Sequence, residues 1–284
     1  MILFSLPDYY HFYDLNLNLL QLMDEQPEKF YEDVKVDSIY GSFPCIWNGG
    51  RYYSGSTSYE NIVATVQPFT ERGISLRHTF TNCLLTEKHL HDTLCNKICE
   101  LTHSSLHGVN VSSPILKEYL EKKYPKFYIM WSTTLCTEDL AQINQLSEKN
   151  LLVLDYNLNN NFDVLAQLEH PENIEILVCE SCILNCPSRR EHYTHESNCQ
   201  LFNETTTYTC PWVKDQNFYT GIQKRSHHVD IDSIRKDYLP LGINKFKIMG
   251  RGRPAVETIE NYVNYLVKPE YKDDIRMQLL HSIS

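Results

Sequence analysis

The stretch ILVCESCILNCPSRREHYTHESNCQLFNETTTYTCPW, residues 176–212, holds five of the ten cysteines of the chain. It overlaps a short apolar run, residues 174–178, which is rich in β-branched residues and therefore predicts a buried strand. Such a strand would deliver the cysteines into the loop that follows it. The place of this strand among the other apolar runs determines which fold the sequence predicts.

Short apolar runs alternate with helical patterns along the whole chain. The predicted strands are residues 2–6, 38–44, 75–80, 108–111, 127–131, 151–155, 174–178 and 245–248. The predicted helices include residues 15–23, a helix from about 59, residues 87–101, a helix from about 114, residues 137–148 and a last helix over 257–267. Residues 151–155 are apolar almost throughout, as strands of parallel sheets are when both faces are buried.

Eight strands alternating with helices over 284 residues are the count and length of a β/α barrel. The sequence predicts one (β/α)8 TIM-barrel-like domain, residues 1–284, with a cysteine-bearing insertion at 179–235 between strands seven and eight. The alternative is a doubly wound open sheet. No glycine-rich dinucleotide fingerprint follows the first strand, which argues against that alternative.

The cysteines follow the spacing Cys179-x2-Cys182-x3-Cys186, and Cys199 and Cys210 come later. Thiolates gathered in this way bind zinc, or iron in a 4Fe–4S cluster that takes four cysteines. Disulfides or buried core thiols are the alternatives. Because loops after barrel strands form the active-site face, the cysteine loop is expected at the catalytic mouth.

Other polar residues are predicted at the same rim. Asn82 follows strand three and Asn157 follows strand six, where either could orient a substrate or only cap a helix. In the segment 250–253, Gly250 allows close backbone approach, and Arg251 and Arg253 suit a carboxylate or phosphate. A salt bridge to an acidic rim residue is the alternative for these arginines.

Two residues between the cysteines suit a supporting role. Arg189 and His192 could hydrogen-bond to cluster sulfides or bind substrate, because donors around such a centre tune it. His192 could also be a metal ligand itself. These roles depend on the metal site that the cysteines predict.

The composition limits the partners. A formal net charge of −10 argues against broad nucleic-acid binding. The sequence has no apolar run of about 18 residues that could span a membrane. The N-terminus lacks the basic start and long apolar stretch of a signal peptide, which predicts a cytoplasmic protein. In that compartment the cysteines are expected to be ligands and core thiols rather than disulfides.

Residues 241–251, LGINKFKIMGR, resemble the signature G-[IV]-x-x-[LF]-K-I-E-G-R of the collagenase-like peptidase family, the U-thirty-two group. Gly250 and Arg251 match the signature, whereas Met249 stands where the family has Glu. The length is closest to the short anaerobic ubiquinone-biosynthesis members, which work as heteromeric pairs. The resemblance implies a β/α-barrel-like fold and a 4Fe–4S cluster, for which Cys182, Cys186, Cys199 and Cys210 are the preferred ligands and Cys179 the reserve.

Several functions are compatible with this resemblance. The first is an iron–sulfur enzyme that hydroxylates a small molecule or an RNA base without oxygen. The alternatives are a peptidase, or a non-catalytic metal-binding subunit of a heteromeric complex, with zinc as the alternative metal. The sequence has no His-Glu-x-x-His motif and no clear serine elbow, which disfavours hydrolysis.

Overall fold

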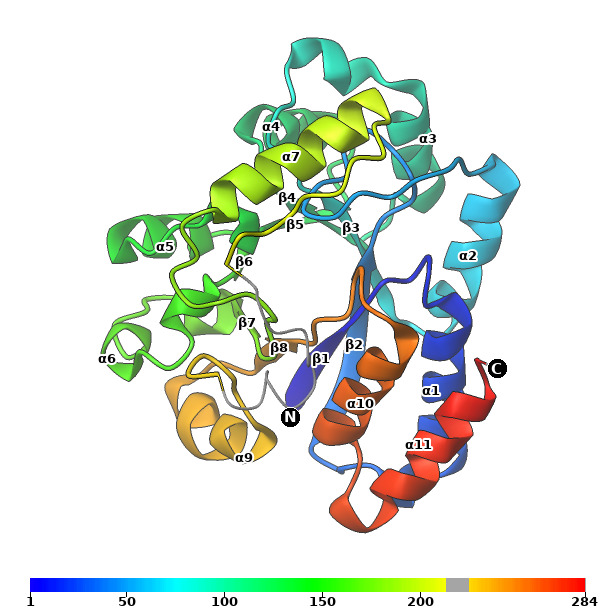
Figure 1. Cartoon of the computed structure of the whole chain (residues 1–284), viewed down its shortest axis with the longest axis vertical. Helices are drawn as coiled ribbons and strands as arrows, with labels where there is room; N and C mark the ends of the chain where they lie inside the picture. The colour runs from blue at the N-terminus through cyan, green and yellow to red at the C-terminus, as the bar shows by residue number, and fades with distance from the viewer. Residues whose placement is uncertain (213–224, 284) are drawn as a thin grey trace.

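Eight parallel strands close into a barrel in the order β1 to β8 (Figure 1). This arrangement is seen in a computed structural model that describes residues 1–212 and 225–283. The strands are β1 Ile2–Pro7, β2 Val34–Gly41, β3 Ser75–Phe80, β4 Gly108–Val111, β5 Tyr128–Trp131, β6 Leu151–Val153, β7 Ile174–Leu177 and β8 Lys245–Lys247. The predicted TIM-barrel-like fold is confirmed.

The barrel closes through β8, which pairs with both β1 and β7. Phe246 is the register partner of Phe4 on one side and of Ile176 on the other, and all three are fully buried. Helices surround the strands and cover this apolar outer side of the sheet (Figure 1). Packing of the alternate apolar side chains under the helices is therefore what makes such short strands stable.

The barrel interior also contains charged groups. Arg77 forms a buried ion pair with Glu175, and its Nη2 lies 3.2 Å from Asp37 Oδ2. An ion pair out of contact with water is stable only when its hydrogen-bonding groups are satisfied. Here the Tyr128 hydroxyl accepts a further hydrogen bond from Arg77 Nε at 2.9 Å, whereas Glu175 Oε2 has no hydrogen-bond partner among the described residues.

The helices follow the strands as a β/α barrel requires. They are α1 Tyr13–Glu25, α2 Tyr59–Glu71, α3 Thr93–Thr102, α4 Pro114–Lys123, α5 Leu140–Ser147, α6 Phe162–Leu165, α7 Arg189–Phe202, α9 Ile231–Ser233, α10 Ala255–Leu266 and α11 Lys272–His281. Within the described residues, no helix is both long and apolar enough to cross a lipid bilayer.

Two predicted helices differ from the structure. The helix predicted over 87–101 is divided at Asp92, because the Asp92 side chain accepts a hydrogen bond from Cys95 N at 2.8 Å and starts α3 anew after a 3-10 turn. The helix predicted over 257–267 is not the last one. Behind it α11 buries Ile275 and Leu279, one helical turn apart, against the domain.

The segment between β7 and β8 contains the cysteines. Helix α7 crosses over β4 and β5 at one side of the barrel mouth, and α9 lies outside the barrel (Figure 1). Residues 213–224 of the predicted insertion at 179–235 lie outside the described residues. The part that is described places α7 above the carboxyl ends of the strands.

Candidate functional site

Helix α7 is attached to the barrel mouth at both of its ends. At its first residue, Arg189 forms a buried ion pair with Asp155, which directly follows β6. Near its last turn, Gln200 Oε1 accepts hydrogen bonds from Tyr53 N at 2.9 Å and from Asn48 Nδ2 at 3.1 Å. The helix therefore spans the mouth and covers the loop 48–53.

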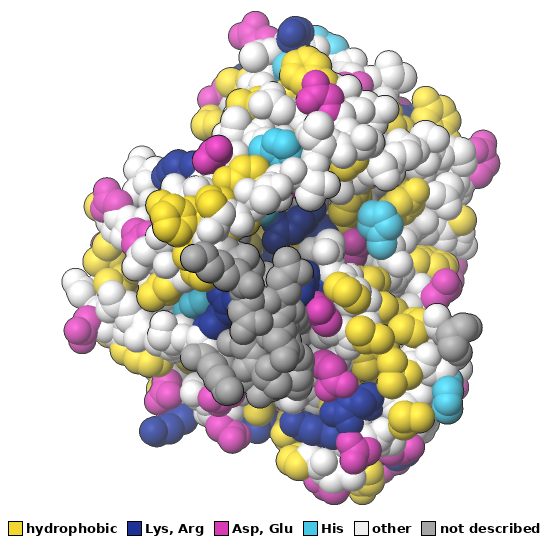
Figure 2. Space-filling model, in the orientation of Figure 1, with side chains coloured by type: hydrophobic (Ala, Val, Ile, Leu, Met, Phe, Trp, Pro, Cys, Tyr) yellow, Lys and Arg dark blue, Asp and Glu magenta, His cyan; other side chains and the backbone are white. Residues whose placement is uncertain are grey.

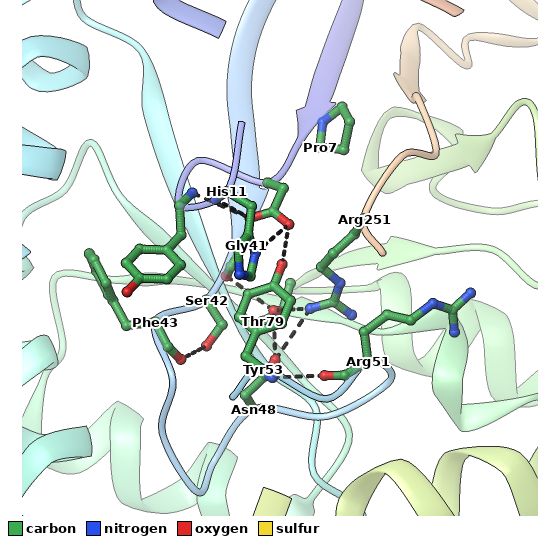
Figure 3. Close-up of polar contacts among 12 residues, drawn as sticks. Pro7, His11, Gly41, Ser42, Phe43, Asn48, Arg51, Tyr53, Thr79 and Arg251 are labelled. Atoms are coloured by element: carbon green, nitrogen blue, oxygen red, sulfur yellow. Dashed lines mark hydrogen bonds and ion pairs between the residues drawn. The ribbon is translucent and has the colours of Figure 1, made fainter. Parts of the chain in front are cut away.

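Arg251, which follows β8, holds the loop 48–53 through hydrogen bonds (Figure 3). Arg251 Nη1 donates to Thr79 Oγ1 and to Asn48 Oδ1, and its Nη2 donates to Gly49 O at 3.0 Å. A Cβ at Gly49 would lie 2.5 Å from backbone atoms of Thr81. Only glycine allows the loop to lie this close to the end of β3.

A cavity of about 70 Å³ lies between this loop, the strand ends and α7. We call it the mouth cavity, and the lining residues that matter most here are Arg51, Thr81, Asn110, Glu180, Lys247 and Arg251. Figure 2 shows Lys and Arg side chains near the centre of this face. The site therefore offers positive charge at the carboxyl ends of the strands.

The charges in the mouth cavity influence one another. Burial would raise the pKa of the Glu180 carboxyl, but Arg51 and the Cys182 backbone N–H hold that pKa below its ordinary value. Burial lowers the pKa of the Lys247 amine to about 7; the Glu175 charge opposes this, and Arg251 adds to it. At neutral pH the site thus combines a carboxylate with an amine that is partly uncharged.

Two polar atoms of the cavity wall lack a partner in the described part of the chain. Thr81 Oγ1 and Asn110 Oδ1 are buried and make no hydrogen bond there. An unsatisfied buried polar atom costs about 1–3 kcal/mol. A ligand bound in the mouth cavity would supply hydrogen-bond partners for both atoms.

The structure brings some of the predicted metal ligands together and separates others. Burial raises the pKa of the Cys182 thiol to about 11, and Cys186 is near enough to contribute to this rise. Cys199 Sγ lies 3.4 Å from His195 Nε2, on a part of α7 that is ten residues, or about 15 Å, from the start of the helix. Cys210 precedes Trp212, whose Nε1 donates to Ser188 Oγ at 2.9 Å.

The reserve ligand Cys179 is fully buried, and its Sγ accepts a hydrogen bond from Met249 N at 3.2 Å. Across residues 1–212 and 225–283, no three His, Cys, Asp or Glu side chains gather as metal ligands. The chemistry of Cys182 and Cys186 suits zinc or an iron–sulfur cluster, but Cys199 does not join them. The four-cysteine set therefore stays a prediction.

The predicted substrate residues differ in where they lie. Arg251 and its neighbourhood form the cavity floor, whereas Arg253 Nε bonds Glu257 Oε2 at 2.7 Å in α10. A Cβ at Gly250 would lie 2.6 Å from Pro7 Cγ, so this glycine allows close packing of the segment after β8. Of the two arginines expected to bind an anion, only Arg251 lines the cavity.

The two predicted asparagines contact protein rather than the mouth cavity. Asn82 Nδ2 donates to Ile46 O at 2.9 Å and to Ser197 O at 3.1 Å, which joins the loop after β3 to α7. Asn157 Nδ2 donates to Glu138 Oε1 at 2.7 Å and borders a different hollow. Both side chains hold loops in place in this structure.

The residues expected to support the metal site lie on α7. Arg189 points to Asp155, as described above. His192 Nε2 lies 3.4 Å from Glu196 Oε1, and its ring stacks on Tyr208 at 4.5 Å between centroids. These contacts fasten the segment after α7 to the helix.

Sequence reasoning did not single out Arg51, Glu180 or Lys247. Arg51 belongs to a loop rich in Gly, Tyr and Ser, and Glu180 lies between two cysteines that form a more conspicuous pattern. Lys247 lies within the signature segment, where the apolar run predicts only a strand. The sequence nevertheless contains a signal for Lys247. Lys245 and Lys247 flank the apolar Phe246 and therefore point to the same side of a buried strand, where their charges need a polar environment.

Comparisons with known proteins agree with the fold. No family model matches the chain. An uncharacterized protease of Methanocaldococcus jannaschii is 21% identical over 269 residues, which cover 89% of this chain and 78% of that protein. A solved structure of a U32 peptidase superposes with a TM-score of 0.56 at 15% identity, covering 89% of this chain and 94% of the other.

The likeness to the solved structure shows the barrel fold. Together, the two comparisons support the resemblance to the U32 collagenase-like peptidase family that residues 241–251 predicted.

Proposed function

We propose that this protein is an enzyme that binds a small substrate by its anionic group in the mouth cavity and modifies it there. This proposal rests on one observation. Arg51 and Arg251 line the same cavity as Thr81 Oγ1 and Asn110 Oδ1, two buried atoms that have no hydrogen-bond partner among the described residues. Guanidinium groups suit carboxylate or phosphate, and the two polar atoms would orient the remainder of the substrate.

The proposed reaction type is a redox modification such as oxygen-independent hydroxylation. A bound iron–sulfur cluster would supply electron transfer beside the cavity. The support for this part is that Cys186 is near enough to influence the pKa of Cys182, in a segment whose residue Glu180 lines the cavity. The protein itself would bind the substrate through Arg51 and Arg251. Helix α7 would limit the access of water to the cavity.

Ligand binding tests the first part of the proposal. Calorimetry with benzoate and with uridine monophosphate would distinguish carboxylate from phosphate recognition. We expect Arg51→Met to weaken binding at least tenfold, because it removes one charge-assisted contact. Arg253→Met is the matched control, since Arg253 pairs with Glu257 outside the cavity. Equal binding by wild type and Arg51→Met would overturn the proposed site.

Anaerobic purification tests the cofactor. We expect a brown protein that contains iron and acid-labile sulfide and loses its colour in Cys182→Ser and Cys186→Ser. Cys95→Ser is the control, because Cys95 is buried in α3. The Cys199→Ser variant decides whether this distant thiol is a ligand. A colourless protein with stoichiometric zinc would overturn the redox proposal.

Peptide hydrolysis is the second candidate, because both similar proteins carry peptidase names. Release of fluorescent peptides from labelled gelatin by the wild type, and not by Arg51→Met, would favour it. Absence of hydrolysis by a protein that binds benzoate or the nucleotide would exclude it.

A further inference from the structure

Lys247 lies at the carboxyl end of β8, where its side chain lines the mouth cavity. Its neighbour Phe246 is fully buried and packs on Phe4 and Tyr238, with ring centroids 5.9 Å apart in both pairs. Lys245, two residues earlier, donates instead to Glu172 O at the opposite end of the strand. The side chains of Lys245 and Lys247 therefore lie at opposite ends of the barrel.

The Lys247 amine has an unusual environment. Its Nζ lies 3.7 Å from the centroid of the Tyr40 ring, and the described residues place no carboxylate within ion-pair distance of it. The nearby acid Glu175 is already paired with Arg77. Burial and the charges of Arg77 and Arg251 disfavour the ammonium form, and the Glu175 charge only partly offsets them, which leaves the amine with a pKa of about 7.

An uncharged lysine amine is a nucleophile toward carbonyl carbon. The cavity has room for roughly five water-sized groups, so the part of a ligand that it encloses is small. Arg51 and Arg251 provide partners for a carboxylate in the same space. A small compound that has both a carbonyl and a carboxylate fits this cavity: the carbonyl can react with the amine, the carboxylate can bind the two guanidinium groups, and the molecule is small enough for the volume.

We propose that Lys247 is a nucleophile that forms an imine with a small 2-oxo acid bound in the mouth cavity. The Nζ lone pair attacks the carbonyl carbon and forms the C–N bond. Both amine protons pass to the carbonyl oxygen, which leaves as water, and a C=N bond remains. The step needs no oxidant or reductant. This inference rests on the proposed function, because it uses the same anion-binding cavity.

Reductive trapping of the full-length protein tests the inference. Glyoxylate with cyanoborohydride converts an imine into a stable carboxymethyl-lysine, which peptide mass mapping locates. We expect modification at Lys247 to rise with a midpoint near pH 7 and to be faster at that pH than at exposed lysines, whose amines are almost fully protonated there. Burial sets this midpoint together with the charges of Glu175, Arg251 and Arg77, and the Tyr40 ring also faces the amine.

Matched variants make the result specific. Lys247→Arg keeps a positive charge and should lose the label at least tenfold, whereas Lys245→Arg should keep it. A label spread over surface lysines and unchanged in Lys247→Arg would overturn the inference. Glyoxylate that binds in calorimetry without any label on Lys247 would also overturn it while leaving the proposed function intact. Loss of both binding and label would overturn the two together.

Discussion

Arg189 Nη1 donates to both carboxylate oxygens of Asp155, at 2.7 and 2.6 Å. This contact joins the first residue of α7 to the end of β6, 34 residues earlier in the chain. Both side chains are buried, with exposed fractions of 7% and 1%. The guanidinium also lies 4.1 Å from the centroid of the Tyr156 ring. The cysteine-bearing segment is positioned over the mouth by this ion pair.

Removing one partner of this pair should release α7. We expect Asp155→Asn to destabilise the protein by about 3–5 kcal/mol, because Arg189 would keep a buried charge without its partner. Urea denaturation and faster amide exchange within α7 would show the effect. The control is Asp24→Asn at the exposed pair with Arg72, where about 0–1 kcal/mol is expected. Equal costs at the two positions would contradict the proposed anchoring.

For the Arg77–Glu175 ion pair inside the barrel, replacing both partners should destabilise the protein less than replacing Glu175 alone. Glu175→Leu leaves Arg77 buried and is expected to cost about 3–5 kcal/mol. Arg77→Met combined with Glu175→Leu should recover part of that loss, because the buried pair of charges is removed while Asp37 loses its partner Arg77. Chemical denaturation of the single and double variants measures this coupling. A double variant as unstable as Glu175→Leu would show that the polar network around Tyr128 is required.

Gly49 should be essential for the shape of the mouth cavity. Gly49→Ala would force a methyl group into the backbone of Thr81, displace Arg51 and weaken benzoate binding, with a cost of about 1–3 kcal/mol in stability. Gly55→Ala is the control, because a Cβ at Gly55 would meet no atom within 4 Å, although its φ of +96° makes alanine unfavourable by about 1–2 kcal/mol. Benzoate affinity should fall only in Gly49→Ala.

The lowered pKa of Lys247 predicts a pH-dependent cost to folding. The unfolded chain binds a proton on this lysine up to about pH 10.5, whereas the folded protein loses it near pH 7. The penalty is therefore complete below pH 7 and disappears as the pH rises to 10.5. Lys247→Met should stabilise the protein most below pH 7, and the gain should fall by about 1.4 kcal/mol for each pH unit above it.

Urea denaturation across this pH range measures the gain. Lys97→Met is the control at a surface ion pair with Glu100, where a change of less than about 1 kcal/mol is expected. A gain for Lys247→Met that does not vary with pH would show that the amine is not the group responsible.

The sequence was informative wherever structure depends on neighbouring residues. The apolar runs predicted all eight strands and the closed barrel, because a strand buried on both faces needs a run of consecutive apolar side chains. The limits of two helices differ from the prediction. Asp92 divided one predicted helix by a local cap, and α11 was missed because its burial depends on Ile275 and Leu279 contacting distant parts of the domain.

The candidate site could be predicted only in part. Arg251 was identified from the glycines around it and lines the mouth cavity. Arg51, Asn110 and Lys247 join it from loops and strands that are far apart in the chain, and only barrel closure brings them together. The resemblance grouped Cys182 and Cys199 in one ligand set; Cys182 precedes α7 and Cys199 lies within it, and the set stays a prediction.

The sequence by itself therefore determined the strand pattern, the barrel and the end of the barrel at which chemistry is expected. Tertiary structure alone decided which charged groups meet in the mouth cavity and the protonation of Lys247. The physical reason is that apolar periodicity is a property of adjacent residues, whereas desolvation and electrostatic interaction depend on distances in space.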